Sequence, residues 1–309
     1  MALAAPLKQR LVEAAYYRGQ ILLDRKQDRE ALADFSMVIA ARSNFRPAYW
    51  FRAKAAFRLG NYQDGQSDLA RFLALEETGS QSEHLGDALV AMGKALRKLG
   101  QDLDGEPRTQ ALTRAANQLQ SAVTSGIRSA EAYQHLGAVR ELLGSRPEAI
   151  ASYSQGLLLE SDNIPLRNLR GWAYSNEKQF DSARADFAEA LRRSPDNSEA
   201  HTGMGFVLAQ LGDNDVARQE ASAALLSGAE NQLILHNVAC IYGRLSDADP
   251  ARKTEHENLA LAALNRAASL ARRSPLGPDA DEQTLIRTEE AFPISLRSRP
   301  EFQRLLNGK

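Results

Sequence analysis

Histidine, cysteine and carboxylate side chains are the groups that could give this chain catalytic or metal chemistry. The sequence holds five histidines, spread along its length, and one cysteine, Cys240. Structural zinc sites and metalloproteases need such residues at short fixed spacings, as in CxxC or HExxH. Neither pattern occurs. We therefore expect no metal and no cofactor.

The nearest approach to a catalytic arrangement is His236 with Cys240, which would lie one helical turn apart. A cysteine nucleophile needs a histidine that takes its proton and a third group that orients the pair. The sequence places no such third group. A hydrolytic enzyme using His236 and Cys240 is the least favoured of three hypotheses, and we favour a structural thiol and a protein that is not an enzyme.

The overall composition also narrows the function. The chain has 38 basic and 39 acidic side chains, a balance that argues against extensive nucleic-acid or anionic-membrane binding. One cysteine allows no intramolecular disulfide. No run approaches the ~20 apolar residues that cross a bilayer, and the N-terminal sequence lacks a secretory apolar core. We expect a cytoplasmic protein.

A period of 34 residues governs the elements that must position any site. Small residues recur at that interval: Gly19 and Ala53, then Gly137, Gly171, Gly205 and Ala239. Gly93 joins the series with six extra residues before it and ten after it. We call these seven positions the markers. They predict seven repeats.

Each repeat is predicted to form two amphipathic helices. Twelve residues after most markers comes a small residue, such as Ala31 or Ala183, followed four residues later by a large apolar one, such as Phe35 or Phe187. These spacings place both on one helical face. Turns between the paired helices are predicted near Gly60, Gly100, Gly144 and Gly212, because glycine suits a helix C-terminus. A single hairpin cannot bury its apolar face, so stacking is required.

This pattern resembles the tetratricopeptide repeat (TPR), in which a small residue lies inside the first helix and an alanine, an aromatic residue and another alanine mark the second. Residues 132–195 carry it best. The resemblance implies an all-α fold, a right-handed superhelix or α-solenoid of about seven helix-turn-helix repeats. It predicts an array over residues 1–274, with repeats at about 12–45, 46–79, 86–129, 130–163, 164–197, 198–231 and 232–274, and a linker and capping helix over 275–309.

Two polar insertions, at residues 101–110 and 247–255, are expected to lengthen turns between paired helices. In the C-terminal segment, Ser298 is a predicted N-cap, Pro300 suits a first turn, and Phe302, Leu305 and Leu306 would share one face. This segment resembles the ending of repeat modules that follow the kinase domain in some bacterial serine/threonine kinases. No kinase signature such as HRD or DFG occurs in the chain.

In the TPR family the first helix of each repeat lines a concave groove, so the resemblance implies a partner-binding surface. Counting from the markers, the groove is predicted to hold Tyr16, Trp50, Lys54, Phe57, Arg58, Lys94, Arg97, Lys98, Gln134, Asn168, Trp172 and Phe206. The lysine-and-asparagine carboxylate clamp of some family members is not predicted, because Trp172 and Phe206 stand where its asparagines would be.

Three hypotheses follow. The favoured one is a non-catalytic protein–protein interaction scaffold, with aromatic anchors and five clustered cations that would suit an acidic segment. The alternative interpretations of those residues are core packing and a solvated helix face. The second hypothesis is a regulatory module of a signalling kinase, and the third is the hydrolase. We expect a protein or peptide partner and no nucleic acid, membrane or small-molecule substrate.

Overall fold

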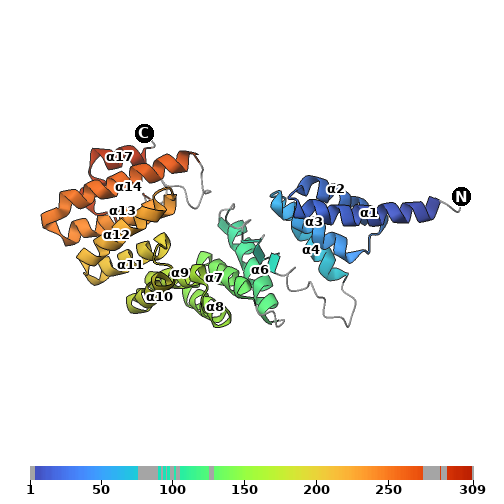
Figure 1. Ribbon diagram of the computed structural model, residues 1–309, viewed down its shortest axis with the longest axis horizontal. Helices are drawn as coiled ribbons and strands as arrows, with labels where there is room; N and C mark the ends of the chain where they lie inside the picture. The colour runs from blue at the N-terminus through green and yellow to red at the C-terminus, as the bar shows by residue number, and fades with distance from the viewer. Residues whose placement is uncertain are drawn as a thin grey trace. The chain divides into compact units, whose positions relative to one another are not determined.

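The computed structural model describes residues 4–75, 90–91, 93–94, 96–97, 101, 105–124, 129–273, 286 and 291–307. All regular secondary structure in these residues is helical (Figure 1), which confirms the all-α prediction. The chain divides into two compact units, Met1–Leu143 and Gly144–Lys309, here called the first and second units. The predicted repeat and domain boundaries remain predictions.

In the first unit, neighbouring helices pack in antiparallel pairs, and the first helices of successive pairs also touch, as α1 touches α3. Residues 90–91, 93–94 and 96–97, before α6, are helical as well. The labelled helices are α1 (Ala4–Asp24), α2 (Asp28–Ala41), α3 (Arg46–Arg58), α4 (Tyr62–Ala74), α6 (Gly105–Thr124) and α7 (Ala130–Leu142).

In the second unit, α9, α11 and α13 contact one another in sequence and form a row of first helices, each paired with the helix that follows it. Its helices are α8 (Arg146–Leu159), α9 (Ile164–Asn176), α10 (Phe180–Arg193), α11 (Ser198–Leu211), α12 (Asn214–Gly228), α13 (Gln232–Ala248), η1 (Pro250–Arg252), α14 (Lys253–Arg273), α16 (Ile294–Arg297) and α17 (Pro300–Leu306).

The markers Gly19, Gly93 and Gly171 are small because the second helix presses a ring or branched side chain against each of them. A Cβ atom on Gly19 would lie 2.8 Å from Cζ of Phe35, and one on Gly171 would lie 2.8 Å from the ring of Phe187. Both phenylalanines are fully buried. The predicted pairing of small and large residues is therefore a direct contact between the two helices of a hairpin.

Side-chain caps begin the first helices at the same 34-residue interval. Asn163, Asn197 and Asn231 each accept a hydrogen bond from a backbone N–H in the first turn of α9, α11 and α13, at 2.7–3.3 Å. Ser129 does the same for α7. Such caps satisfy backbone donors that have no partner inside the helix. They fix where each of these first helices starts.

The predicted turn glycines Gly60, Gly144 and Gly212 have φ of +80°, +79° and +88°, as the left-handed C-cap requires. Gly100 lies outside the described residues. At the equivalent positions of two other hairpins the chain uses Lys26, with φ +60°, and Lys178, with φ +58°. A side chain in this region costs free energy that glycine avoids.

The insertion around residues 247–255 does not form the long turn expected of it. Instead α13 runs on to Ala248, a single turn of η1 follows, and α14 begins at Lys253. Asp249 ends α13 and accepts from the backbone and side chain of Arg252, which makes the sharp connection possible without a loop. In the other insertion, Gly105–Gln110 extend α6.

The C-terminal segment packs as a cap on α14, and its helix α17 makes the contact. Phe302 and Leu305 are buried and Leu306 is partly buried on the same core, as predicted. The N-cap of α17 is Arg299, not Ser298. Ser298 ends α16 instead, where its hydroxyl donates to the carbonyl of Ile294 at 2.7 Å.

Replacing Lys178 by glycine should raise the free energy of unfolding, because it removes left-handed strain at an exposed position. We expect a gain of about 0.5–1 kcal/mol, the strain relieved less the greater backbone freedom of glycine in the unfolded chain. Urea denaturation followed by circular dichroism measures it. Lys178→Ala is the control and should give no gain; a gain as large as that of Lys178→Gly would contradict the strain.

Candidate functional site

The inner helices of the second unit carry a continuous row of three side chains, Trp172 of α9, Phe206 of α11 and Arg244 of α13. We call this row the inner strip. The Trp172 and Phe206 rings lie 5.9 Å apart, and the Arg244 guanidinium lies 6.0 Å from the Phe206 ring. All three side chains are half-buried. Successive hairpins therefore present one aromatic and cationic surface that is partly open.

Contacts on both sides of the inner strip hold it in place. Trp172 also meets the buried Phe187 edge-on at 5.5 Å. The side-chain oxygen of Gln210, assigned from this contact, accepts from Nε and Nη2 of Arg244 at 2.6 and 3.1 Å. The repeat pattern predicts Trp172 and Phe206 as groove residues, but Arg244 was missed. Arg244 stands 34 residues after Gln210, at the equivalent position of the seventh repeat, so the same counting would have found it.

Asn168, one turn before Trp172, is almost fully buried rather than open, at 1% exposure. Its amide nitrogen donates to Asn197 at 3.1 Å and to the Glu199 carboxylate at 3.3 Å. Burial raises the pKa of Glu199, and the hydrogen bond from Asn168 opposes that rise. Asn168 thus ties α9 to the start of α11 beside the inner strip. Its direct contact with a partner stays a prediction.

The chain's own C-terminal segment covers α13 around His236 and Gly243. The Phe292 ring meets the His236 ring at 5.9 Å, and the carbonyl of Ala291 lies 2.7 Å from where a Cβ of Gly243 would be. His236 is 5% exposed and Cys240 is 2% exposed. The two residues of the hydrolase hypothesis are therefore buried in a packed interface, which suits a structural role.

In the first unit, the predicted groove aromatics take part in packing between helices. Tyr16 lies 5.0 Å from the Phe45 ring, and burial raises the pKa of its hydroxyl. Trp50 packs on Phe72 at 6.1 Å. The Phe57 ring fills the space that a Cβ on Gly65 would need. Tyr16, Trp50 and Phe57 are half-buried, so each keeps some open surface.

The predicted cations of the first unit differ in their freedom. Lys54 is exposed and forms no ion pair with the described residues. Arg58 donates to the Leu23 carbonyl at 2.7 Å and to Asp28 at 3.1 Å, which anchors α3 to the α1–α2 turn. Lys94 pairs with Glu131 of α7 at 2.6 Å. Lys98 lies outside the described residues.

Lys94 and Arg97 lie close enough to His135 for their charges to act on it. Burial, followed by the charges of Arg97 and Lys94, lowers the pKa of His135 to about 4, although Glu131 acts in the opposite direction. His135 is therefore neutral at pH 7 and adds no charge of its own. Gln134, the adjacent predicted site residue, is half-buried on α7.

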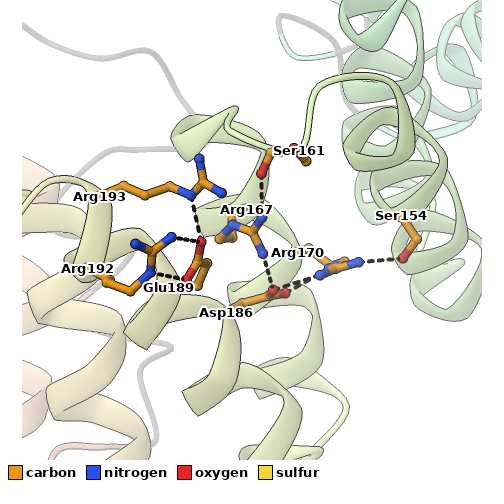
Figure 2. Close-up of polar contacts among 8 residues, drawn as sticks. All are labelled: Ser154, Ser161, Arg167, Arg170, Asp186, Glu189, Arg192 and Arg193. Atoms are coloured by element: carbon orange, nitrogen blue, oxygen red, sulfur yellow. Dashed lines mark hydrogen bonds and ion pairs between the residues drawn. The ribbon is translucent and has the colours of Figure 1, made fainter.

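A repeated arginine–aspartate pair, which the sequence analysis missed, joins the two helices of several hairpins. Nε and Nη2 of Arg170 donate to Asp186 at 2.7 Å each, while Nη1 donates to Ser154 of the preceding α8 at 3.1 Å (Figure 2). Arg52 bonds Asp68 in the same way, and Ser36 of α2 at 3.2 Å. The signal was an arginine directly before the marker and an aspartate sixteen residues later.

Asp186 also lies 3.4 Å from Arg167, whose other contact is the Ser161 carbonyl at 2.6 Å (Figure 2). This carboxylate is 5% exposed and so depends on its two guanidinium partners. Glu189, one turn further along α10, is more open. Hydrogen bonds from Arg192 and then Arg193 lower its pKa to about 2.

Comparison with known proteins places this geometry in a fold class. Residues 176–235 match the family model described as tetratricopeptide repeat. No curated protein matches. Among solved structures, the C-terminal part of a TPR-containing protein from Cytophaga hutchinsonii superposes with TM-score 0.61 at 19% identity, covering 86% of this chain and 97% of that one. A TPR protein from Parabacteroides merdae gives 0.58 at 12% identity, covering 85% and 98%.

A third solved structure is YrrB, described as a TPR protein with an unusual peptide-binding site, with TM-score 0.52 and 17% identity, covering 65% of this chain and 96% of that one. At these identities the likeness concerns the fold. Paired helices, their stacking and these matches together define a TPR α-solenoid.

Within the part of the chain that the structure describes, no three histidine, cysteine or carboxylate side chains gather as a metal site would need. Among the same residues, none of the helices combines the length and apolarity that a bilayer crossing requires.

Removing the Asp186 carboxylate should destabilise the second unit strongly. In Asp186→Ala, Arg170 and Arg167 lose a buried partner, so we expect a loss of about 3 kcal/mol in the free energy of unfolding. Glu189→Ala removes a half-buried carboxylate that pairs with Arg192 and Arg193 of its own helix, and should lower the urea midpoint far less than Asp186→Ala does. Similar midpoints for the two variants would show that the buried pair does not hold the hairpin.

Proposed function

We propose that this protein is an interaction scaffold and that its inner strip binds a segment of another protein. The observation that carries the proposal is the row of Trp172, Phe206 and Arg244 across three successive hairpins. Aromatic and arginine side chains that are partly desolvated and held in place dominate the binding energy of protein interfaces. Neighbouring contacts order these side chains before binding, so little entropy is lost on association.

The inner strip suits a segment that offers an apolar side chain beside a carboxylate. The apolar group would pack on the open faces of Trp172 and Phe206, and the carboxylate would receive the guanidinium of Arg244. YrrB, whose fold is similar, is described as having a peptide-binding site, which supports a peptide-like partner. The expectation that the first unit binds an acidic segment of a partner rests on Lys54, Lys94 and Arg97. After burial, the charges of Arg97 and Lys94 are what lower the pKa of His135.

The kinase-linked alternative rests on the resemblance of the C-terminal segment alone. That segment packs on α13 and α14, as a cap on any solenoid end would, so its packing does not favour a kinase. The scaffold therefore remains the function that the geometry supports best.

The pair of substitutions Phe206→Ala and Arg244→Glu should remove partner binding. We expect affinity to fall by at least about thirtyfold, the loss typical of an interface hot spot. The full-length chain and this variant are used as baits, and retained proteins are quantified by mass spectrometry and then titrated individually. Thermal unfolding of the variant confirms that it is folded at the assay temperature.

The matched control is Leu226→Ala, because Leu226 is 89% exposed on α12 and lies outside the inner strip. It should retain the same partners as the wild type. A second variant, Lys54→Glu with Lys94→Glu, tests whether the first-unit cations contribute. Retention of every partner by Phe206→Ala/Arg244→Glu would contradict the proposed function.

A further inference from the structure

Helices α3, α7, α9, α11 and α13 each pack on the second helix of the preceding hairpin, and α3 shows the contact in detail. Ala48 and Ala55 of α3 are fully buried, with Phe45 and Phe51 beside them on the same side. Phe51 stacks on Phe35 of α2 at 5.5 Å. This side of α3 is therefore an interface that α2 covers.

Helix α1 presents the equivalent face with no described residue covering it. The positions 34 residues before Phe45, Ala48, Phe51 and Ala55 are Leu11, Ala14, Tyr17 and Ile21. Leu11 is 59% exposed, Tyr17 is 62% exposed and Ile21 is 52% exposed. We call these four residues the α1 face. It keeps the apolar character of a repeat interface although it lies on the surface.

Arg18 supplies an independent sign that the α1 face is incomplete. Its Nε donates to Asp34 at 2.7 Å, as in the other arginine–aspartate pairs, and Nη2 also bonds Asp34. In Arg52 and Arg170 the remaining Nη1 donates to a serine on the preceding second helix. In Arg18 this nitrogen has no partner among the described residues. The Arg18 side chain is 66% exposed, against 26% and 20% for the other two.

The helices that cover the equivalent faces define what would fit. In α2 the covering residues include Leu32, Phe35, Ser36 and Ile39, and in α8 the same positions are Ile150, Tyr153, Ser154 and Leu157. Both sets place apolar side chains at i, i+3 and i+7 and a serine hydroxyl at i+4. These spacings form one stripe on a helix.

We propose that the α1 face binds an α-helix of another protein whose surface copies this stripe, with the hydroxyl accepting from Nη1 of Arg18. The two helices of this chain in which the stripe is described are already engaged, since α3 covers α2 and Arg170 of α9 donates to Ser154 of α8. A second copy would therefore not offer either stripe, and we assign the α1 face to a helix of another protein. The site is separate from the inner strip, so it neither needs nor replaces the proposed function.

The test uses a dye-labelled peptide with the sequence of residues 27–42, which contains the α2 stripe. A hydrocarbon staple replaces Ala33 and Met37, two exposed positions, to hold the short peptide helical. Fluorescence anisotropy with the full chain should show saturable binding. Tyr17→Asp combined with Ile21→Asp should weaken it more than about tenfold, since two apolar contacts become buried charges.

Two controls isolate the α1 face. Leu226→Asp adds a charge at an exposed leucine on another helix and should bind as the wild type does. Serine-to-alanine substitution at position 36 of the peptide should weaken binding about fivefold, because Nη1 of Arg18 loses its acceptor. Circular dichroism should show that both protein variants keep their helicity.

Absence of saturable binding, or equal affinity for the wild type and the Tyr17→Asp/Ile21→Asp variant, would overturn the proposal. Analytical ultracentrifugation of the wild type alone tests whether a second copy of the chain occupies the α1 face. If the wild type forms a dimer that these two substitutions dissociate, the α1 face binds a second copy and the proposal is wrong.

Discussion

The structure depends on close contact between the backbone of a first helix and a large side chain of a second helix. Phe187 of α10 shows it best, because Gly171 of α9 and Gly203 of α11 both face its ring without room for a Cβ. One side chain therefore joins the two helices of its own hairpin and also the next hairpin. Repeating this contact buries apolar surface that a lone hairpin would expose.

This arrangement separates the buried contacts that stabilise the hairpins from the surface proposed to bind a partner. The second helices bury large aromatic side chains such as Phe35 and Phe187, and arginine–aspartate pairs such as Arg170 with Asp186 join the two helices of a hairpin. The first helices are then held side by side, so that Trp172, Phe206 and Arg244 meet although they are far apart in the sequence. The inner strip is thus preorganised by contacts made elsewhere.

The repeat could be predicted because the small and large residues in contact recur at a fixed interval, and turn glycines such as Gly212 mark the hairpins. Other features depend on spatial neighbours that no local pattern reveals. Arg58 is anchored to the α1–α2 turn, Asn168 is buried by α11, and the residue 247–255 insertion continues helices. Trp172 and Phe206 of the inner strip follow from counting along the repeat, whereas Arg244 was missed, and the contacts that order all three lie between helices.

The most direct test of stacking is the free energy of unfolding of Gly203→Ala. Alanine favours an isolated helix by about 1 kcal/mol, so a gain is expected if the glycine serves no packing role. Close packing against the Phe187 ring instead predicts a loss of about 1–3 kcal/mol, because the new methyl group meets that ring, and recovery when Phe187→Leu is added. A more stable Gly203→Ala variant, measured by urea denaturation, would contradict the close packing.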